Sequence, residues 1–297
     1  MILFIKKTIL FLFLFIASNF IYLIILQKTD WNYKKRIDAL TLDAPDNDII
    51  VIGNSLAMDG IDTELLSQNG YQSYNLSLGG SSLRTNYIQL NEYLTLYEKK
   101  PKCVILGLGS YLNDFEKETI HPIVEYTQKD REVSFRDLPM LKFRWLFKEL
   151  LKKLVSKAHR EASLKYGQLR FKKQVPDNTA LDHNNDFPID RYKSAPFIYD
   201  IIDLCSDYDI ELIIVEMPGL KKTRHKKRFN CMLLDEVNNN GLLLDYNNFS
   251  DCEIFDDQKD WIGDSHLNAY GAKKMTTRLL SDLQKMDVTA PQRLKCR

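Results

Sequence analysis

The stretch Asp48-Ile-Ile-Val-Ile-Gly-Asn-Ser55 decides the fold of this chain. Its four consecutive apolar residues, Ile49 to Ile52, are typical of a strand that is buried on both faces of a parallel sheet. The apolar run stops at Gly53, which permits a tight turn and leaves space beside the next side chains. Ser55 is therefore expected at the carboxyl end of a strand, the edge where open α/β sheets bind ligands. Taken alone, the same residues are also what an ordinary turn between a strand and a helix contains.

Short apolar runs and helical segments alternate along the rest of the chain. Further strands are predicted at 71–78, 102–108, 210–215 and 241–244. Helices are predicted at 61–68, 83–97, 192–208 and 269–286. Ser81 or Ser82 can cap the second of these helices. This alternation predicts an α/β domain with a central parallel sheet over residues 47–286, followed by a polar tail at 287–297.

The alternation is interrupted between residues 115 and 192. Residues 138–173 are helix-like and rich in Lys and Arg, and a polar stretch follows at 176–188. We interpret this region as a helical insertion or lid on the α/β core. Its charged residues are expected to form a solvated helix face.

Thr8 to Leu26 form a nearly unbroken apolar run near the amino terminus. As a helix this run would be about 28 Å long, close to the thickness of a bilayer core. A cleaved signal peptide is the competing interpretation. The run is long for a signal peptide, and no small-residue cleavage site precedes Trp31. We therefore expect a transmembrane anchor at 8–26 and a polar juxtamembrane linker at 27–46.

The charges beside this run give a weak indication of orientation. Lys6 and Lys7 lie on one side, and more basic residues lie on the other: Lys28, Lys34, Lys35 and Arg36. Taken literally, the positive-inside rule slightly favours a cytoplasmic position for the body.

The overall composition limits the classes of partner. The 297 residues include 41 Lys or Arg and 40 Asp or Glu, which is too balanced a charge to indicate nucleic-acid binding. Of the five cysteines, Cys103 and Cys205 are expected to be buried small hydrophobes, and Cys231 and Cys252 can form a pair that the sequence does not establish. No Cys-x-x-Cys pair or His/Cys cluster indicates a metal, and no cofactor is predicted.

Polar residues with complementary chemistry follow three predicted strands. Ser55 follows the first, Gly79 and Gly80 the second, and Asn113 the third, and His266 lies in a late loop. A serine nucleophile needs a general base, and it also needs hydrogen-bond donors for the oxyanion of the tetrahedral intermediate. His266 can be the base, while the Gly-Gly backbone and the Asn113 amide can be the donors.

In these blocks the sequence resembles the SGNH (GDSL-like) hydrolase superfamily. The matching blocks are Gly53-Asn-Ser55, Asn75-Leu-Ser-Leu-Gly-Gly80, Gly109-Ser-Tyr-Leu-Asn113 and Asp264-Ser-His-Leu-Asn268. The resemblance implies a flavodoxin-like three-layer α/β/α fold. It also implies that Ser55 is the nucleophile, that His266 is the base, and that the oxyanion hole is formed by the Ser55 backbone, Gly79 or Gly80, and Asn113.

The sequence departs from the family pattern at two points. The usual Gly-Asp-Ser triplet is Gly-Asn-Ser here, and membrane-anchored relatives vary at this position. The usual acid would lie at position 263, which is Gly, so the nearest carboxylate is Asp264, two residues before His266. An Asp-x-His pair occurs in the alginate O-acetyltransferase branch of the family. Asp260 is the alternative orienting residue, and a Ser55–His266 dyad is the remaining one.

The resemblance also bears on function. An amino-terminal anchor resembles the architecture of SGNH proteins that acylate surface polymers outside the cytoplasmic membrane, together with a multispanning acyltransferase that supplies the acyl group. It implies a single-pass O-acyltransferase, with an extracytoplasmic catalytic domain and a glycan or polymer acceptor, and we weigh this above the charge count. The alternatives are an esterase or deacetylase with the same site, and a non-catalytic assembly factor, which Gly263 would suit.

A basic run follows the strand at 210–215. Six of its eight residues are Lys or Arg: Lys221, Lys222, Arg224, Lys226, Lys227 and Arg228. Such a run is ordinarily a solvated loop or the start of a helix. The alternative is a site for an anionic glycan acceptor or for lipid headgroups.

Overall fold

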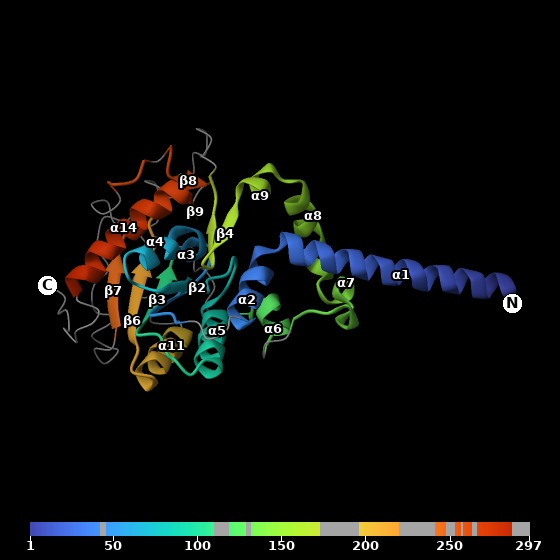
Figure 1. The fold of residues 1–297 in the computed structure, drawn as a ribbon, viewed down its shortest axis with the longest axis horizontal. Helices are drawn as coiled ribbons and strands as arrows, with labels where there is room; N and C mark the ends of the chain where they lie inside the picture. The colour runs from blue at the N-terminus through green and yellow to red at the C-terminus, as the bar shows by residue number, and fades with distance from the viewer. Residues whose placement is uncertain are drawn as a thin grey trace.

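A central sheet of five parallel strands organises the structure, a computed structural model that describes residues 1–41, 46–109, 119–128, 132–172, 196–219, 241–247, 253–256, 258–262 and 266–286 (Figure 1). The strands are β1 (Ile49–Gly53), β2 (Ser73–Asn75), β3 (Cys103–Leu108), β6 (Glu211–Glu216) and β7 (Gly241–Asp245). Their order across the sheet is β2-β1-β3-β6-β7, and every neighbouring pair is parallel. This is the strand order of flavodoxin-like folds, so the predicted fold class is confirmed.

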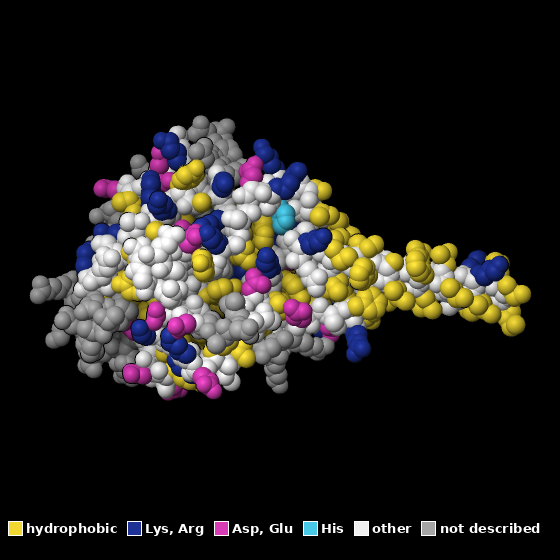
Figure 2. All heavy atoms as spheres, viewed as in Figure 1, with side chains coloured by type: hydrophobic (Ala, Val, Ile, Leu, Met, Phe, Trp, Pro, Cys, Tyr) yellow, Lys and Arg dark blue, Asp and Glu magenta, His cyan; other side chains and the backbone are white. Residues whose placement is uncertain are grey.

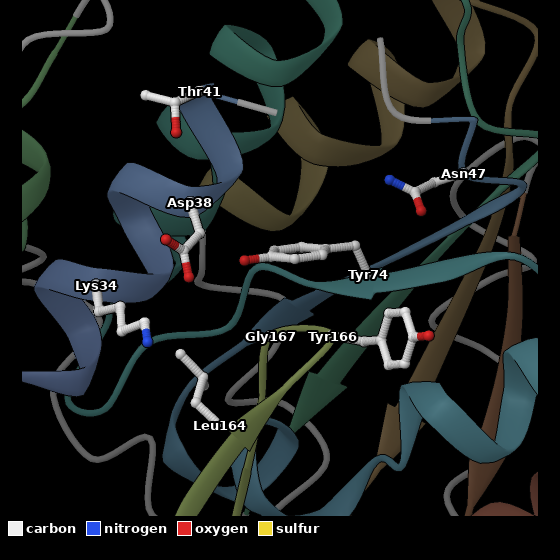
Figure 3. A pocket seen from close by; sticks show the side chains of 8 residues that line it. All are labelled: Lys34, Asp38, Thr41, Asn47, Tyr74, Leu164, Tyr166 and Gly167. Carbon is white, nitrogen blue, oxygen red and sulfur yellow. The ribbon is translucent and has the colours of Figure 1, made fainter. Parts of the chain in front are cut away.

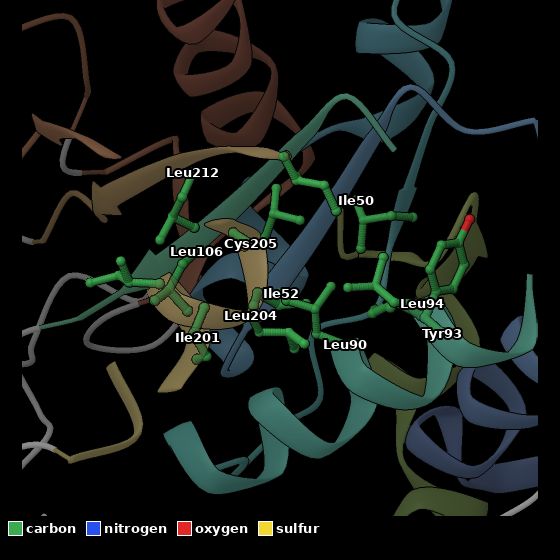
Figure 4. Close-up of a cluster of buried hydrophobic side chains, with 14 of the residues drawn as sticks. Ile50, Ile52, Leu90, Tyr93, Leu94, Leu106, Ile201, Leu204, Cys205 and Leu212 are labelled. Carbon is green, nitrogen blue, oxygen red and sulfur yellow. The ribbon is translucent and has the colours of Figure 1, made fainter. Parts of the chain in front are cut away.

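Helices cover both faces of the sheet (Figure 1). On one face lie α5 (Leu83–Leu96) and α11 (Pro196–Asp207), and on the other lie α3 (Ser55–Gly60), α4 (Thr63–Gln68) and α14 (Ala269–Met286). Ile50 and Ile52 pack toward α5 and α11 (Figure 4), whereas Ile49 and Val51 pack toward α3 and α14. Because successive strand residues face opposite sides, burial on both sides requires the continuous apolar run that β1 shows.

The region between β3 and α11 is helical over most of its described length, as the sequence predicts. It contains α6 (Pro122–Tyr126), α7 (Pro139–Lys142), α8 (Phe147–Val155) and α9 (Lys157–Glu161), with short 3₁₀ turns at Phe135–Asp137 and Arg144–Leu146. The helical prediction for 138–173 is wrong at its end, where β4 (Ser163–Lys165) and β5 (Gln168–Arg170) form an antiparallel hairpin. Tyr166 and Gly167 have φ angles of 46° and 78°, as a two-residue type I′ turn requires.

The β4–β5 hairpin lies against the edge strand β2. The backbone N–H of Asn75 donates to the carbonyl oxygen of Tyr166 at 3.0 Å, and Gln168 Nε2 donates to the carbonyl oxygen of Asp59 at 3.1 Å. Gly167 is required at the tip, because a Cβ there would lie 2.2 Å from the Asn75 carbonyl oxygen. The hairpin thus occupies hydrogen-bonding groups at a sheet edge that would otherwise be open.

The amino-terminal helix α1 (Ile2–Thr29) projects from the body, and its last third packs on α7 and α8 (Figure 1). It is long and apolar enough to cross a membrane. Asn19, Tyr22 and Leu26 on this helix are buried, and the Tyr22 hydroxyl donates to the carbonyl oxygen of Phe143. This part of α1 is therefore integrated into the fold of the body.

Within the predicted polar linker at 27–46, the described residues 27–41 are mostly helical. After α1 only Asp30 precedes a second helix, α2 (Trp31–Thr41), which is docked on the body. Lys35 is fully buried and donates to the carbonyl oxygen of Ser77, and Arg36 pairs with Glu92. The run of basic residues in this segment suggests a solvated linker, but two of them point into the protein.

Candidate functional site

Ser55 and His266 meet at the carboxyl end of the sheet, although 211 residues separate them in the sequence. Ser55 is the first residue of α3, directly beyond β1, and His266 begins β9 (His266–Leu267), which pairs with β8 (Trp261–Ile262). His266 Nε2 lies 2.8 Å from Ser55 Oγ, within hydrogen-bonding distance. The pair sits beside the point where the strand order reverses, between β1 and β3.

Glycines at the ends of β1 and β3 allow α3 to begin so close to the sheet. Gly53 has a φ of +150°, and a Cβ on it would lie 2.5 Å from the carbonyl oxygen of Gly107, its partner on β3. A Cβ on Gly109 would lie 2.0 Å from Leu56 Cδ1. Asn54 Oδ1 caps the helix by accepting from the Leu56 N–H at 2.9 Å. The Gly-Asn-Ser triplet thus supplies, in succession, the turn, the helix cap and the serine that lies beside His266.

His266 is held by the start of the last helix. Asn268 is buried; its Nδ2 donates to the carbonyl oxygen of Lys259 at 2.6 Å, and its Oδ1 accepts from the N–H groups of Tyr270 and Gly271 at 2.9 and 3.1 Å. Burial lowers the pKa of His266 below its usual value of 6.5. The imidazole is therefore neutral at pH 7, which is the form that can accept a proton from Ser55.

Of the two carboxylates considered for orienting His266, the structure describes Asp260 only. Asp260 is buried, and its Oδ2 accepts hydrogen bonds from Lys274 Nζ at 2.6 Å and from the Asp256 N–H at 2.7 Å. This carboxylate therefore ties the segment before β8 to α14. Asp264 lies outside the described residues.

The predicted oxyanion donors are partly described. The Gly79 N–H donates to Asn32 Oδ1 at 2.9 Å, and Asn32 Nδ2 donates back to the Gly79 carbonyl oxygen at 3.3 Å. Gly80 has a φ of +78° and is exposed. A Cβ at this position would have no other atom within 4 Å. Asn113 lies outside the described residues, as does the whole basic run from Lys221 to Arg228.

Several residues that support the site carry no prediction of their own. Asn32 on α2 hydrogen-bonds the backbone of Gly79, and Asn75 Nδ2 donates to the carbonyl oxygen of Ala57 in α3 at 2.9 Å. Asp59, also on α3, is buried near Lys35; burial raises the Asp59 pKa well above its usual value and lowers the Lys35 pKa to about 7. Asn75 lies within one of the family-like blocks, which is a sequence indication of its importance. Nothing comparable marks Asn32.

Cysteines and metal ligands can be placed only in part. Cys103 and Cys205 are buried and free, as expected of small hydrophobic residues. Cys231 and Cys252 lie outside the described residues. Within the described part of the chain, no group of three or more His, Cys, Asp and Glu side chains could hold a metal ion.

A separate pocket of about 440 Å³ lies between α2, β2 and the β4–β5 hairpin (Figure 3). Its walls include Lys34 and Asp38 of α2, the rings of Tyr74 and Tyr166, and the Asn47 amide. Neither Ser55 nor His266 lines it. It belongs to the junction between α2 and the hairpin, apart from the serine–histidine pair.

Comparison with known proteins gives structural similarity only. Neither a family model nor a curated protein matches the sequence. Solved structures that resemble the chain include a candidate acylhydrolase from Bacteroides fragilis (12% identity, 86% of this chain and 98% of that chain covered, TM-score 0.44). They also include a GDSL-like lipase from Bacteroides thetaiotaomicron (10% identity, 86% of this chain and 99% of that chain covered, TM-score 0.43). A third is an SGNH-hydrolase family esterase, AlinE4 (13% identity, 84% of this chain and 100% of that chain covered, TM-score 0.34).

Proposed function

We propose that this chain is an SGNH-type serine enzyme, anchored in the cytoplasmic membrane, that transfers an acyl group to a hydroxyl of a cell-surface or exported polysaccharide. The observation that carries the catalytic part is the 2.8 Å contact between Ser55 Oγ and His266 Nε2 at the carboxyl end of β1. A retained nucleophile–base pair also favours an enzyme over a non-catalytic assembly factor. Acetyl is the acyl group that the family resemblance suggests.

In the first half-reaction, Ser55 Oγ attacks the carbonyl carbon of the acyl donor while His266 Nε2 takes the hydroxyl proton. The negative charge moves to the carbonyl oxygen. We assign its stabilisation to the backbone N–H of Ser55 and Gly80 and the side chain of Asn113. Gly80 is preferred to Gly79 because the Gly79 N–H already donates to Asn32. Collapse of the intermediate expels the leaving group, which receives the proton from His266.

In the second half-reaction, a hydroxyl of the acceptor attacks the acyl-Ser55 carbonyl and gives its proton to His266. Collapse transfers the acyl group to the acceptor and returns the proton to Ser55. Water in place of the acceptor hydroxyl makes the same site an esterase or deacetylase. The two activities share the acyl-enzyme and differ in acceptor binding and in water exclusion.

The membrane part of the proposal is supported by α1. The helix is long and apolar enough to span a bilayer, and Asn19, Tyr22 and Leu26 near its end are buried in the body. Cleavage after a signal peptide would remove contacts that the body uses, which favours a retained anchor. The extracytoplasmic position of the body, and a multispanning acyltransferase as the source of acyl groups, follow from the resemblance to anchored SGNH proteins.

An acyl-capture experiment tests the function. Incubation of the full chain with an activated acetyl ester should add one acetyl group to the peptide that contains Ser55, as read by mass spectrometry. Adding an anionic or neutral polysaccharide should shift the released acetyl from acetate to polymer-bound ester. Labelling followed only by acetate release, with every acceptor tried, would identify the esterase alternative. Absence of any label on Ser55 would contradict the enzymatic proposal.

We further propose that the basic run from Lys221 to Arg228 binds the acceptor and takes no part in the chemical step. Reversing Lys226, Lys227 and Arg228 to Glu should weaken binding to an anionic polymer, and the loss should shrink as salt is raised. Hydrolysis of a small neutral ester should change little, because that substrate carries no charge for the run to attract. A collapse of the small-ester rate would show that the run supports the site or the fold.

A further inference from the structure

The segment from Pro139 to Val155 exposes an unusual amount of apolar surface for a body in water. Six large side chains on α7, the following 3₁₀ turn and α8 are each between 41% and 74% exposed: Leu141, Trp145, Phe147, Leu151, Leu154 and Val155. We call these six residues the apolar patch. A scattered exposed leucine needs no explanation, but a contiguous group of this size marks an interaction site.

Helix α8 is divided sharply between the patch and a charged face. At about 100° per residue, Phe147, Leu151, Leu154 and Val155 fall within an arc of roughly 100°. Lys148, Glu149 and Lys152 lie outside that arc and are exposed, while Leu150 is buried in the body. The buried face of α8 is thus satisfied by Leu150, and the exposed apolar arc has no cover within the described residues.

The patch adjoins α1 where this helix leaves the body. The Met140 N–H donates to Asn19 Oδ1 at 3.1 Å, and the ring of Tyr22 stacks on Phe147 with centroids 6.2 Å apart. Hydrophobic side chains cover the projecting part of α1 and continue onto the end of the body that it joins (Figure 2). The apolar surface of the proposed membrane anchor and the apolar patch are therefore continuous.

The charge around the patch suits an anionic lipid surface. Between residues 139 and 160 the chain carries seven Lys or Arg and a single acidic residue, Glu149. Trp145 lies within the patch, and tryptophan is enriched at the boundary between lipid and water. Apolar residues on one face and Lys or Arg on the other are the pattern of helices that lie in the plane of a membrane surface.

The depth of the contact agrees with this geometry. If the membrane-spanning run ends at Leu26, Asn19 lies seven residues inside it, about 10 Å along the helix axis, and Tyr22 lies four residues inside, about 6 Å. Interfacial helices bury their apolar face roughly 5–10 Å into the headgroup and acyl boundary. The segment packed on Asn19 and Tyr22 is held at the depth that such a helix occupies.

We infer that α7 and α8 form a second membrane contact, in which the apolar patch enters the surface of an anionic bilayer beside α1. This inference rests on the proposed membrane placement of α1 and does not depend on the catalytic chemistry. The occupant of the patch is lipid, with the basic side chains of the opposite face at the level of the phosphates.

Quenching of tryptophan fluorescence by lipid tests the inference. The full chain and its Trp145→Phe variant are inserted into nanodiscs of phosphatidylglycerol and phosphatidylcholine with brominated acyl chains. The difference between the two emission spectra isolates Trp145. That difference signal should be blue-shifted, and brominated lipid should remove most of it. Leu154→Glu should restore much of the signal by lifting the patch from the lipid.

Leu96→Glu is the matched control, because Leu96 is an exposed leucine at the end of α5 and lies outside the patch. It should leave the quenching of Trp145 unchanged. Entry into nanodiscs without quenching of Trp145 would overturn the second membrane contact and leave the anchor intact. Failure of the full chain to enter nanodiscs would overturn both. Ester turnover is not a readout, so a failure of the proposed chemistry remains distinguishable.

Discussion

Ser55→Ala is expected to reduce acyl transfer by a factor on the order of 10⁶, the size of the loss when a comparable triad loses its nucleophile. In the proposed mechanism, Ser55 Oγ bonds to the acyl group and passes its proton to His266 Nε2, which lies 2.8 Å away. Alanine removes both and leaves the helix cap intact, because Asn54 provides it. Turnover of an activated ester, with mass spectrometry of the Ser55 peptide, measures the effect.

The fold should survive this substitution, and thermal unfolding should show little change. Ser134→Ala is a suitable control, because Ser134 is exposed and lies in the insertion. It should retain full turnover. Undiminished turnover in Ser55→Ala would refute the enzymatic proposal, whatever the behaviour of the control.

Asp264→Asn is expected to lower turnover by up to about 10⁴ while leaving stability nearly unchanged. A carboxylate on His266 Nδ1 keeps the proton there, so that Nε2 is free to accept from Ser55. Asparagine preserves the shape of the side chain but allows the wrong tautomer. We assign this role to Asp264 because it lies two residues before His266 in the sequence, and because Asp260 Oδ2 already binds Lys274 and the Asp256 N–H.

Asp260→Asn is the matched comparison and should show the opposite profile. It weakens the ion pair with Lys274, so the melting temperature should fall while turnover stays within a few-fold of the parent. Turnover and thermal melting of both variants, measured side by side, separate the two roles. A large turnover loss in Asp260→Asn alone would make Asp260 the orienting residue. Full turnover in both variants would leave a Ser55–His266 dyad.

The sheet was predictable because its strands are buried on both faces. Most positions of β1, β3 and β6 are therefore apolar; in β6 the apolar run Leu212–Val215 lies between Glu211 and Glu216. The bounds of these three strands differ from prediction by a residue or so. The hairpin β4–β5 lacks that property: its strands have three residues each and are mostly polar. The Tyr166-Gly167 turn is its only local indication, and the helical pattern upstream outweighs it.

In the candidate site, the residues marked by local sequence were predicted, and those that depend on tertiary contacts were not. Ser55 follows directly from β1, and His266 follows from its place in a family-like block, so the sequence indicates both. Asn32 was not predictable, because its role depends on α2 docking beside Gly79, a contact across 47 residues. Lys35 was missed for a related reason: a lysine among basic neighbours suggests solvent exposure, whereas burial near Asp59 depends on tertiary structure.

The joint between α1 and α2 sets how far the enzyme can reach. Asp30 is the only residue between the two helices; its Oδ1 accepts from the Tyr33 N–H at 2.9 Å, and its Oδ2 pairs with Lys153 Nζ at 3.2 Å. Because these contacts fix the joint, no flexible linker separates α1 from the body. On the proposed membrane placement, Ser55 is held at one height above the bilayer. If the acceptor is a polymer, as proposed, it is then modified only where it passes through that layer, close to the membrane, and more distant chains are not reached.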